Sequence, residues 1–263
     1  MGEASAPGPR HDRGLLLLGP LRNRVLSLEE VERYGRDSFG NADHVSIYGL
    51  RPAEWYGRGI RILGRTAVEC TRDVLGDAIG REVALEVGRL SPVRRILVLD
   101  PFAGSCNTLH WLLRHLPSAA GLAFEMDSMV FELAGRNLAL LGRPIELVHG
   151  GYQTLLAERA IPGGPALVVF VAPPWGTALD EREGLDLART VPPVTEIIDR
   201  IVGNFPERSL LFAIQIHEKV EPGSLEEVQR RLDRTRMQVF ELDAPGRNHG
   251  IILGTRAWPA PST

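Results

Sequence analysis

Short apolar runs and helix-like stretches alternate along most of the chain from residue 95 onward. The apolar runs predict strands at 95–99, 121–125, 145–149, 166–171 and 209–216. The stretches that follow them predict helices near 107–116, 128–141, 153–160, 192–203 and 224–233. Residues 238–242 and 250–256 predict a final antiparallel pair around a turn at Pro245-Gly246. Alternation of this kind predicts an α/β fold, in which helices cover both faces of a mostly parallel sheet.

The segment Ile96–Thr108 is typical of a buried strand, a tight turn and the start of a helix. Its apolar part ends at Asp100, and the small residues Ala103, Gly104 and Ser105 allow a sharp turn close to a ligand. Such a turn presents free backbone N–H groups at the carboxyl edge of a parallel sheet, where these folds bind ligands. An ordinary connection between strand and helix has the same pattern, so the interpretation depends on the motifs that follow.

Within this segment the run Asp-Pro-Phe-Ala-Gly-Ser-Cys-Asn resembles the Asp-Pro-Phe-x-Gly-x-Gly-Thr signature of amino-directed methyltransferases that use S-adenosylmethionine (SAM). The resemblance implies the class I methyltransferase fold, a Rossmann-like, seven-stranded, mostly parallel sheet, over about residues 90–257. It also implies SAM as the cofactor, bound by Asp100, Phe102, Ala103, Gly104 and Asn107. Cys106 replaces the last glycine of the signature, which leaves the form of the turn open.

An acidic residue ends the second predicted strand. Glu125 follows the glycine turn by about twenty residues, where folds of this kind bind ribose hydroxyls. A carboxylate suits a vicinal diol because it accepts two hydrogen bonds. We therefore expect Glu125 to bind the ribose of the cofactor. Asp127 has the alternative role of capping the helix that starts at Ser128.

The third predicted strand is followed by Gly151, where many relatives in the resembled family have an acid that accepts a hydrogen bond from the adenine amino group. Either a backbone group binds the adenine here, or Tyr152 or Gln153 replaces the acid. Tyr152 is the cofactor-binding candidate, and its alternative interpretation is a partly buried structural tyrosine.

The fourth predicted strand ends in Ala172-Pro173-Pro174-Trp175, which resembles the (Asp/Asn/Ser)-Pro-Pro-(Tyr/Phe/Trp) motif of nucleobase amino-methyltransferases. With Gly176, the form is most similar to trimethylguanosine synthases and to bacterial methyltransferases of RNA and small molecules. The resemblance implies that these four residues form the catalytic site. The prolines fix a backbone carbonyl toward the amine, and the tryptophan offers a flat face for stacking. Ala172 replaces a polar residue that would bind the amine, so either carbonyls and aromatics hold the acceptor or the acceptor is not a nucleobase amine.

Further candidates for the substrate side lie near both ends of the chain. The stretch from Phe39 to Tyr56 is rich in aromatic residues and has no clear period. It is either an aromatic plug packed on the sheet or a lid, formed by Tyr48, Trp55 and Tyr56, that covers a cationic ligand. Asn248 and His249 follow the final turn, at the same sheet edge as His217 at the end of the fifth strand. A lone histidine is more often structural than functional.

The chain divides into three parts by composition. Residues 1–13 are expected to be disordered, 14–90 to form an N-terminal helical and aromatic lid extension, and 91–258 to form the SAM-binding catalytic domain. In the extension, Ser27 and Glu30 predict a capping box for a helix that stops near Gly35. Residues 59–87 predict one helix or two, because glycines interrupt the helical spacing.

Bulk composition limits the partners and the compartment. A formal net charge of −3 over 263 residues argues against a protein that grips long nucleic acids, so a small-molecule substrate is favoured and nucleic acid stays open. Cys70 and Cys106 are too few for a disulfide framework, which points to a reducing cytoplasm. No residue cluster has metal-site spacing, and the apolar run 15–18 is too short to cross a membrane. The excess of arginine over lysine is typical of a high-GC bacterial genome, and the oligomeric state is not predicted.

Three functions remain open at this point. The first is methyl transfer from SAM to an amine nitrogen of a small molecule, such as a secondary metabolite, or of a nucleobase. The second is a SAM cyclase, in which SAM is the sole substrate and forms azetidine-2-carboxylate and methylthioadenosine. The third is a SAM- or nucleoside-binding protein without catalysis, which the unusual Cys106 and Gly151 would suit.

Overall fold

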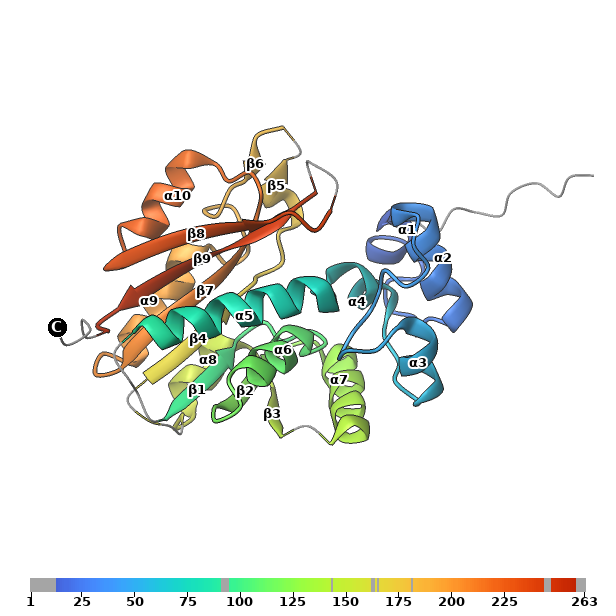
Figure 1. Cartoon of the computed structure of the whole chain (residues 1–263), viewed down its shortest axis with the longest axis horizontal. Helices are drawn as coiled ribbons and strands as arrows, with labels where there is room; N and C mark the ends of the chain where they lie inside the picture. Colours follow the sequence, from blue (N-terminus) through green and yellow to red (C-terminus); the bar gives the residue numbers. More distant parts are fainter. Residues whose placement is uncertain are drawn as a thin grey trace, which may run out of the picture.

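The computed structural model contains a seven-stranded sheet in the order β3-β2-β1-β4-β7-β9-β8 (Figure 1). The first five strands in this order are parallel, and β9 runs antiparallel to both of its neighbours. The strands are β1 Ile96–Asp100, β2 Ala120–Glu125, β3 Ile145–His149, β4 Ala166–Val171, β7 Ser209–His217, β8 Arg234–Phe240 and β9 His249–Arg256. The predicted α/β fold with a seven-stranded, mostly parallel sheet is confirmed.

The structure describes residues 13–90, 95–142, 144–161, 164, 166–180, 182–243 and 247–258. Residues 1–12 of the expected disordered start lie outside this range, and so does the predicted turn at Pro245-Gly246. The first strand of the final pair begins four residues earlier than predicted, at Arg234. Its residues pair with β9, from Arg234 opposite Thr255 to Phe240 opposite His249. The sequence has no periodic pattern that predicts this pairing.

Helices cover both faces of the sheet. One face packs against α5 Asp73–Arg89, α6 Asn107–His115 and α7 Ser128–Leu141. The other face packs against α8 Tyr152–Glu158, α9 Val194–Asn204 and α10 Pro222–Gln229. Alternate residues of β4 enter the two cores, and all six of its residues are buried, as expected for a central parallel strand.

The N-terminal helices form a cluster of their own beside the sheet (Figure 1). They are α1 Arg13–Leu17, α2 Leu28–Phe39, α3 Pro52–Gly57 and α4 Gly64–Glu69. Residues 59–87 therefore contain two helices, α4 and α5, and α5 packs with the sheet rather than with the N-terminal cluster. The remaining short elements are a 3-10 turn at Gly176–Ala178 and the strands β5 Leu179–Asp180 and β6 Gly184–Leu185.

Helix α2 begins at the predicted capping box but does not stop at Gly35. Ser27 Oγ accepts from the Glu30 N–H, and the Glu30 carboxylate accepts from the Ser27 N–H. The helix continues to Phe39 and ends at Gly40, which has a φ of +67°. A Cβ at Gly35 would lie 2.3 Å from the Asn41 carbonyl oxygen, so this glycine allows a close chain contact instead of ending the helix.

No helix within the described ranges combines the length and the apolar character needed to cross a membrane.

Candidate functional site

Hydrogen bonds fix the backbone of the turn between β1 and α6, and one side of this backbone has no protein atoms next to it. The Phe102 N–H donates to Asp100 Oδ1 (3.1 Å), and the Ala103 N–H donates to the Phe124 carbonyl (3.0 Å). Gly104 has a φ of +50°, and no atom lies within 4 Å of the place where its Cβ would be. Burial raises the pKa of Asp100 to about 7. The structure therefore brings Asp100, Ala103 and Gly104 together around an accessible stretch of backbone.

Glu125 joins this turn from the end of β2. One of its carboxylate oxygens accepts from the Gly104 N–H (2.9 Å), and the other accepts from the Asp127 N–H (2.8 Å). Burial raises the pKa of Glu125 above its usual value. Each oxygen has a further lone pair, so the carboxylate can still bind two hydroxyl groups. Asp127 caps α7 as predicted, through the N–H groups of Met129 and Val130.

Cys106 adopts a left-handed backbone conformation that glycine adopts easily. Its φ is +60°, in the left-handed region that a side chain makes unfavourable by about 1–2 kcal/mol. Its side chain is fully buried in the cluster that contains Val98 and Leu109, on the face of the sheet that α5, α6 and α7 cover. The substitution therefore keeps the turn and adds no bulk on the side where Gly104 is open.

Asn107 and Tyr48, predicted as a cofactor residue and a lid residue, bind each other. Asn107 Oδ1 accepts from the Tyr48 N–H (2.6 Å), and its Nδ2 donates to the Thr71 carbonyl (2.7 Å) and to Asp73 Oδ1 (3.1 Å). The Tyr48 hydroxyl donates to the Ser105 carbonyl. These contacts use both side-chain N–H groups of Asn107 inside the protein, and its role in cofactor binding stays a prediction.

The N-terminal aromatics pack inside the protein, and the lid interpretation of this stretch stays a prediction. Trp55 is fully buried in the N-terminal cluster, and its Nε1–H donates to the Val45 carbonyl (3.0 Å). Tyr48 is buried as well, and the Tyr56 ring lies 3.7 Å from the Arg61 guanidinium carbon. The alternative interpretation, an aromatic plug packed on the sheet, agrees with the burial of these rings, although they pack in the N-terminal cluster and not on the sheet.

The end of β4 meets the ends of β7 and β9 in an aromatic cluster. The Trp175 ring lies 5.1 Å from the His249 ring and 6.4 Å from the His217 ring, and the two imidazoles lie 6.3 Å apart. His217 and His249 are paired residues of the β7–β9 ladder, which explains why they meet. The sequence predicts both histidines at one sheet edge but not their contact with Trp175, and these three residues are named here the Trp–His cluster.

The motif before Trp175 keeps the predicted position at the carboxyl edge. Pro173 is buried, Pro174 is exposed, and Ala172 is partly buried against the core. The segment between α4 and α5 reaches this edge too, because Thr71 Oγ1 donates to Gln215 Oε1 (3.0 Å) near the end of β7. Thr71 thus connects the glycine turn, through Asn107, with the Trp–His cluster.

Asn248, predicted as a substrate residue, shapes the connection between β8 and β9. Its Oδ1 accepts from the N–H groups of Leu242 (3.1 Å) and Asp243 (2.9 Å), and it is buried. Its carbonyl accepts from the Glu218 N–H (2.9 Å). These bonds give Asn248 a structural role and its substrate role stays a prediction, whereas His249 lies beside the Pro-Pro-Trp motif.

Tyr152 and Phe102 lie next to each other, close to the turn between β1 and α6. Their ring centroids are 5.2 Å apart, and both pack on the core that α8 and α9 cover. Tyr152 is 3% exposed, and its buried hydroxyl has no hydrogen-bond partner among the described residues. Its prediction as a cofactor residue stays a prediction, and its packing agrees with the structural alternative.

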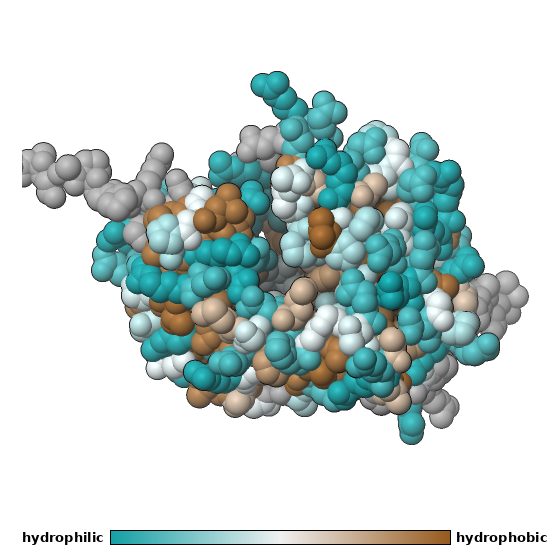
Figure 2. All heavy atoms as spheres, turned by 180° about the vertical axis from the view of Figure 1, so that it is seen from behind, coloured by the Kyte–Doolittle hydropathy of each residue, from teal (hydrophilic) through white to brown (hydrophobic). Residues whose placement is uncertain are grey.

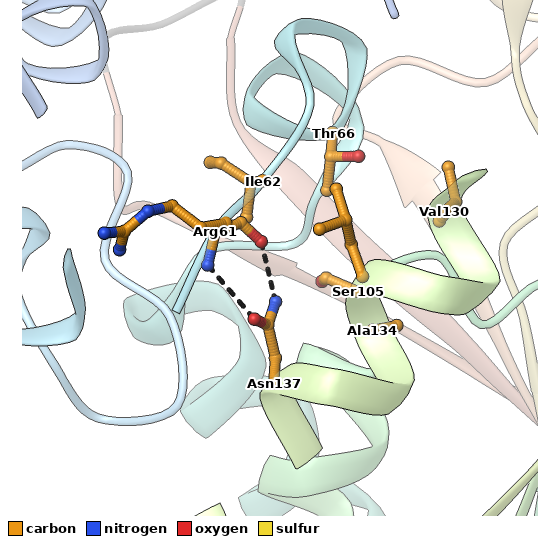
Figure 3. A pocket seen from close by; sticks show the side chains of 8 residues that line it. Arg61, Ile62, Thr66, Ser105, Val130, Ala134 and Asn137 are labelled. Atoms are coloured by element: carbon orange, nitrogen blue, oxygen red, sulfur yellow. Dashed lines mark hydrogen bonds between the residues drawn. The ribbon is translucent and has the colours of Figure 1, made fainter. Parts of the chain in front are cut away.

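Two openings flank the N-terminal segment. The first is a narrow cavity of about 10 Å³ between this segment and α7, which has room for about one water molecule (Figure 3). Asn137 spans it by accepting from the Arg61 N–H and donating to the Arg61 carbonyl. The second is a hollow on the back of the molecule, between the N-terminal helices and the sheet unit (Figure 2). The cavity of about 10 Å³ is too small for a nucleoside.

Within the part of the chain that the structure describes, no group of three or more histidine, cysteine, aspartate or glutamate side chains is arranged to hold a metal ion.

Comparisons with known proteins identify the fold. No family model matches the chain, and no curated protein matches it. The METTL16 MTase domain is similar in structure, with a TM-score of 0.50 and 16% identity over 72% of this chain and 70% of that domain. A Listeria monocytogenes protein described as a candidate class I S-adenosylmethionine-dependent methyltransferase has a TM-score of 0.49 and 14% identity over 71% of this chain.

The human methyltransferase 10 domain containing protein is also similar, with a TM-score of 0.47 and 18% identity over 72% of this chain and 86% of that chain. The present chain spans 62% of the length of the Listeria protein. At these identities the likeness concerns the fold alone. It agrees with the strand order, and the chain has the class I methyltransferase fold.

Proposed function

We propose that this chain is a SAM-dependent methyltransferase that acts on an amine nitrogen of a small molecule. The observation that carries this proposal is the meeting of two half-sites at one sheet edge. The first half-site consists of the open Gly104 turn and the Glu125 carboxylate. The second consists of the Pro-Pro-Trp motif and the Trp–His cluster. The hydrogen bonds of Asn107 and Gln215 to Thr71 connect them.

The residues present fit the cofactor. Glu125 would bind the ribose hydroxyls, because both carboxylate oxygens have spare lone pairs. The backbone at Gly104 would lie against the amino-acid end, where no protein atom fills the space beside it. When bound, SAM supplies a methyl carbon activated by the neighbouring sulfonium.

The acceptor half-site would work by positioning and by excluding water. Trp175 provides a flat face for the acceptor, and the two prolines before it fix the backbone. The amine nitrogen attacks the methyl carbon as the carbon–sulfur bond breaks, and the products are the methylated amine, S-adenosylhomocysteine and a proton. Effective placement of two reactants supplies most of the barrier reduction in reactions of this type. The net charge of −3 favours a small acceptor over a nucleic acid.

A second candidate is the cyclase reaction. It is favoured by Ala172 and by the N-terminal segment that lies across this sheet edge. The alanine offers no polar side chain to an external amine, and the ion pair Arg72–Asp243 fastens the N-terminal segment across the edge. In this reaction the α-amino nitrogen of SAM attacks its own γ-carbon and the carbon–sulfur bond breaks. Azetidine-2-carboxylate, methylthioadenosine and a proton result.

Mass spectrometry of the purified protein separates these functions. The protein is incubated first with SAM alone and then with SAM and a panel of small amines. Methyl transfer predicts that SAM survives alone and that S-adenosylhomocysteine forms with an amine. Accumulation of methylthioadenosine and azetidine-2-carboxylate from SAM alone would replace the first proposal with the second. Binding of SAM without either product would support the third function, a binding protein.

A further inference from the structure

His249 is held in one orientation by a chain of hydrogen bonds. Thr71 Oγ1 donates to Gln215 Oε1 (3.0 Å), which leaves the Gln215 amide nitrogen directed at His249 Nδ1 (3.1 Å). Gln215 is 8% exposed, so its amide has few alternatives. Because an amide nitrogen can only donate, His249 Nδ1 accepts and the ring proton is on Nε2. The chain from Thr71 therefore selects the tautomer of His249.

The surroundings keep this imidazole neutral. Burial, and then the neighbouring His217, lower the pKa of His249 to about 4. Asp243 acts in the opposite direction, while Arg72 and Arg13 lower the pKa further. At neutral pH the Nε2–H is thus a donor on an uncharged ring. Nε2 has no hydrogen-bond partner among the described residues, and the ring lies 5.1 Å from the Trp175 ring, tilted by 35° against it.

We propose that His249 Nε2–H binds a carboxylate that the substrate carries beside its reacting amine, so that the substrate is an amino acid or a close derivative. This inference rests on the proposed function. A donor recognises an oxygen and not the amine itself, and Ala172 provides no competing polar group. A carboxylate is favoured over a neutral carbonyl, because a hydrogen bond to an ionised acceptor is about twice as strong as one to a neutral acceptor.

Histidine ¹⁵N–¹H correlation spectra of the full chain test the inference. In the free protein at pH 7, we expect His249 to show a protonated Nε2 and an unprotonated Nδ1. Glycine and propionate, which carry a carboxylate, are then added and compared with ethanolamine, which has the amine without it. We expect the two carboxylates to shift the His249 Nε2 signal and ethanolamine to leave it unchanged. His149, which is exposed and stacks on Phe131, is the internal control.

Gln215→Glu is the matching variant, because a carboxylate reverses the hydrogen bond. It would accept from His249 Nδ1–H, which moves the proton of the neutral ring away from Nε2. We expect this variant to lose the response to glycine and propionate by at least tenfold in apparent affinity. Gln229→Glu makes the same chemical change at an exposed position at the end of α10 and should behave as the wild type.

Three results would overturn the inference: an Nδ1-protonated His249, an equal response to ethanolamine, or no response to either carboxylate. Binding of S-adenosylhomocysteine is measured separately by calorimetry. Its absence would refute the proposed function, while the histidine spectra, which need no cofactor, would still decide the role of His249.

Discussion

The main-chain N–H of Tyr48 donates to Asn107 Oδ1 over 2.6 Å and so joins two residues that are 59 positions apart in the chain. Asn107 is the first residue of α6, directly after the glycine turn. Its amide also binds Thr71 and Asp73, so a single buried side chain fixes the N-terminal segment against the turn. The segment is therefore part of the site's support and not a loosely attached extension.

Asn107→Ala should destabilise the fold strongly. The substitution leaves the Tyr48 N–H and the Thr71 carbonyl without their partner, and each unsatisfied buried group costs about 1–3 kcal/mol. We expect the free energy of unfolding in urea to fall by about 2–4 kcal/mol. Asn204→Ala is the control, since this exposed residue makes one local bond to the Arg200 carbonyl. If Asn107→Ala lowered the free energy of unfolding no more than Asn204→Ala, Asn107 would not fix the N-terminal segment against the turn.

Trp175→Ala should abolish turnover and leave the fold intact. The ring is partly buried and touches the two imidazoles of the Trp–His cluster, so its loss removes the face against which an acceptor is placed. Misplacement of a reactant costs about 100-fold in rate. Product formation by mass spectrometry gives the activity, and circular dichroism checks the fold. Trp175→Phe keeps a flat ring and should retain more activity than the alanine variant, whereas unchanged activity in Trp175→Ala would remove this residue from the site.

The stability of the chain should depend on His249 between about pH 6.5 and pH 4. In the unfolded chain a histidine takes up a proton near pH 6.5, whereas burial lowers the pKa of His249 to about 4 in the fold. The unfolded state thus binds more protons in this window, and folding stability falls as the pH drops, by about 3 kcal/mol. Asp100, whose pKa burial raises to about 7, has the opposite effect, because its folded form takes up the proton first.

The comparison of wild type with His249→Gln isolates this contribution, because Asp100 titrates in both proteins. Urea unfolding at pH 7.5, 6 and 5 should show a smaller stability loss toward low pH in the variant. Parallel curves for the two proteins would show that His249 titrates normally.

The sequence predicts the sheet well, because each parallel strand is a short apolar run whose burial depends little on its neighbours. β3 and β4 have the predicted bounds, and the turn residues Gly104 and Glu125 meet as expected from their place at strand ends. The capping box at Ser27 is likewise local, since both of its bonds lie within four residues. Local signals of this kind need no knowledge of the tertiary fold.

Contacts between distant segments are what the sequence does not reveal. His217 and His249 meet through the β7–β9 register, and Asn107 turns inward because the N-terminal segment offers it partners. The sequence leaves Trp55 open as part of a plug or of a lid, and in the structure it fills the core of the N-terminal cluster. In each case the contact partner lies far away in the sequence, so no local sequence pattern reveals the contact.

Calorimetric titration with S-adenosylhomocysteine tests the central claim, that this sheet edge is a SAM site. Glu125 is the proposed ribose ligand, and hydrogen bonds to a charged group contribute about 1.5–3 kcal/mol, or about 10- to 100-fold in affinity. We expect the wild type to bind one equivalent, Glu125→Gln to bind about 10- to 100-fold more weakly, and Glu132→Gln, on the exposed side of α7, to match the wild type. No binding by the wild type, or equal affinity in all three proteins, would contradict the account.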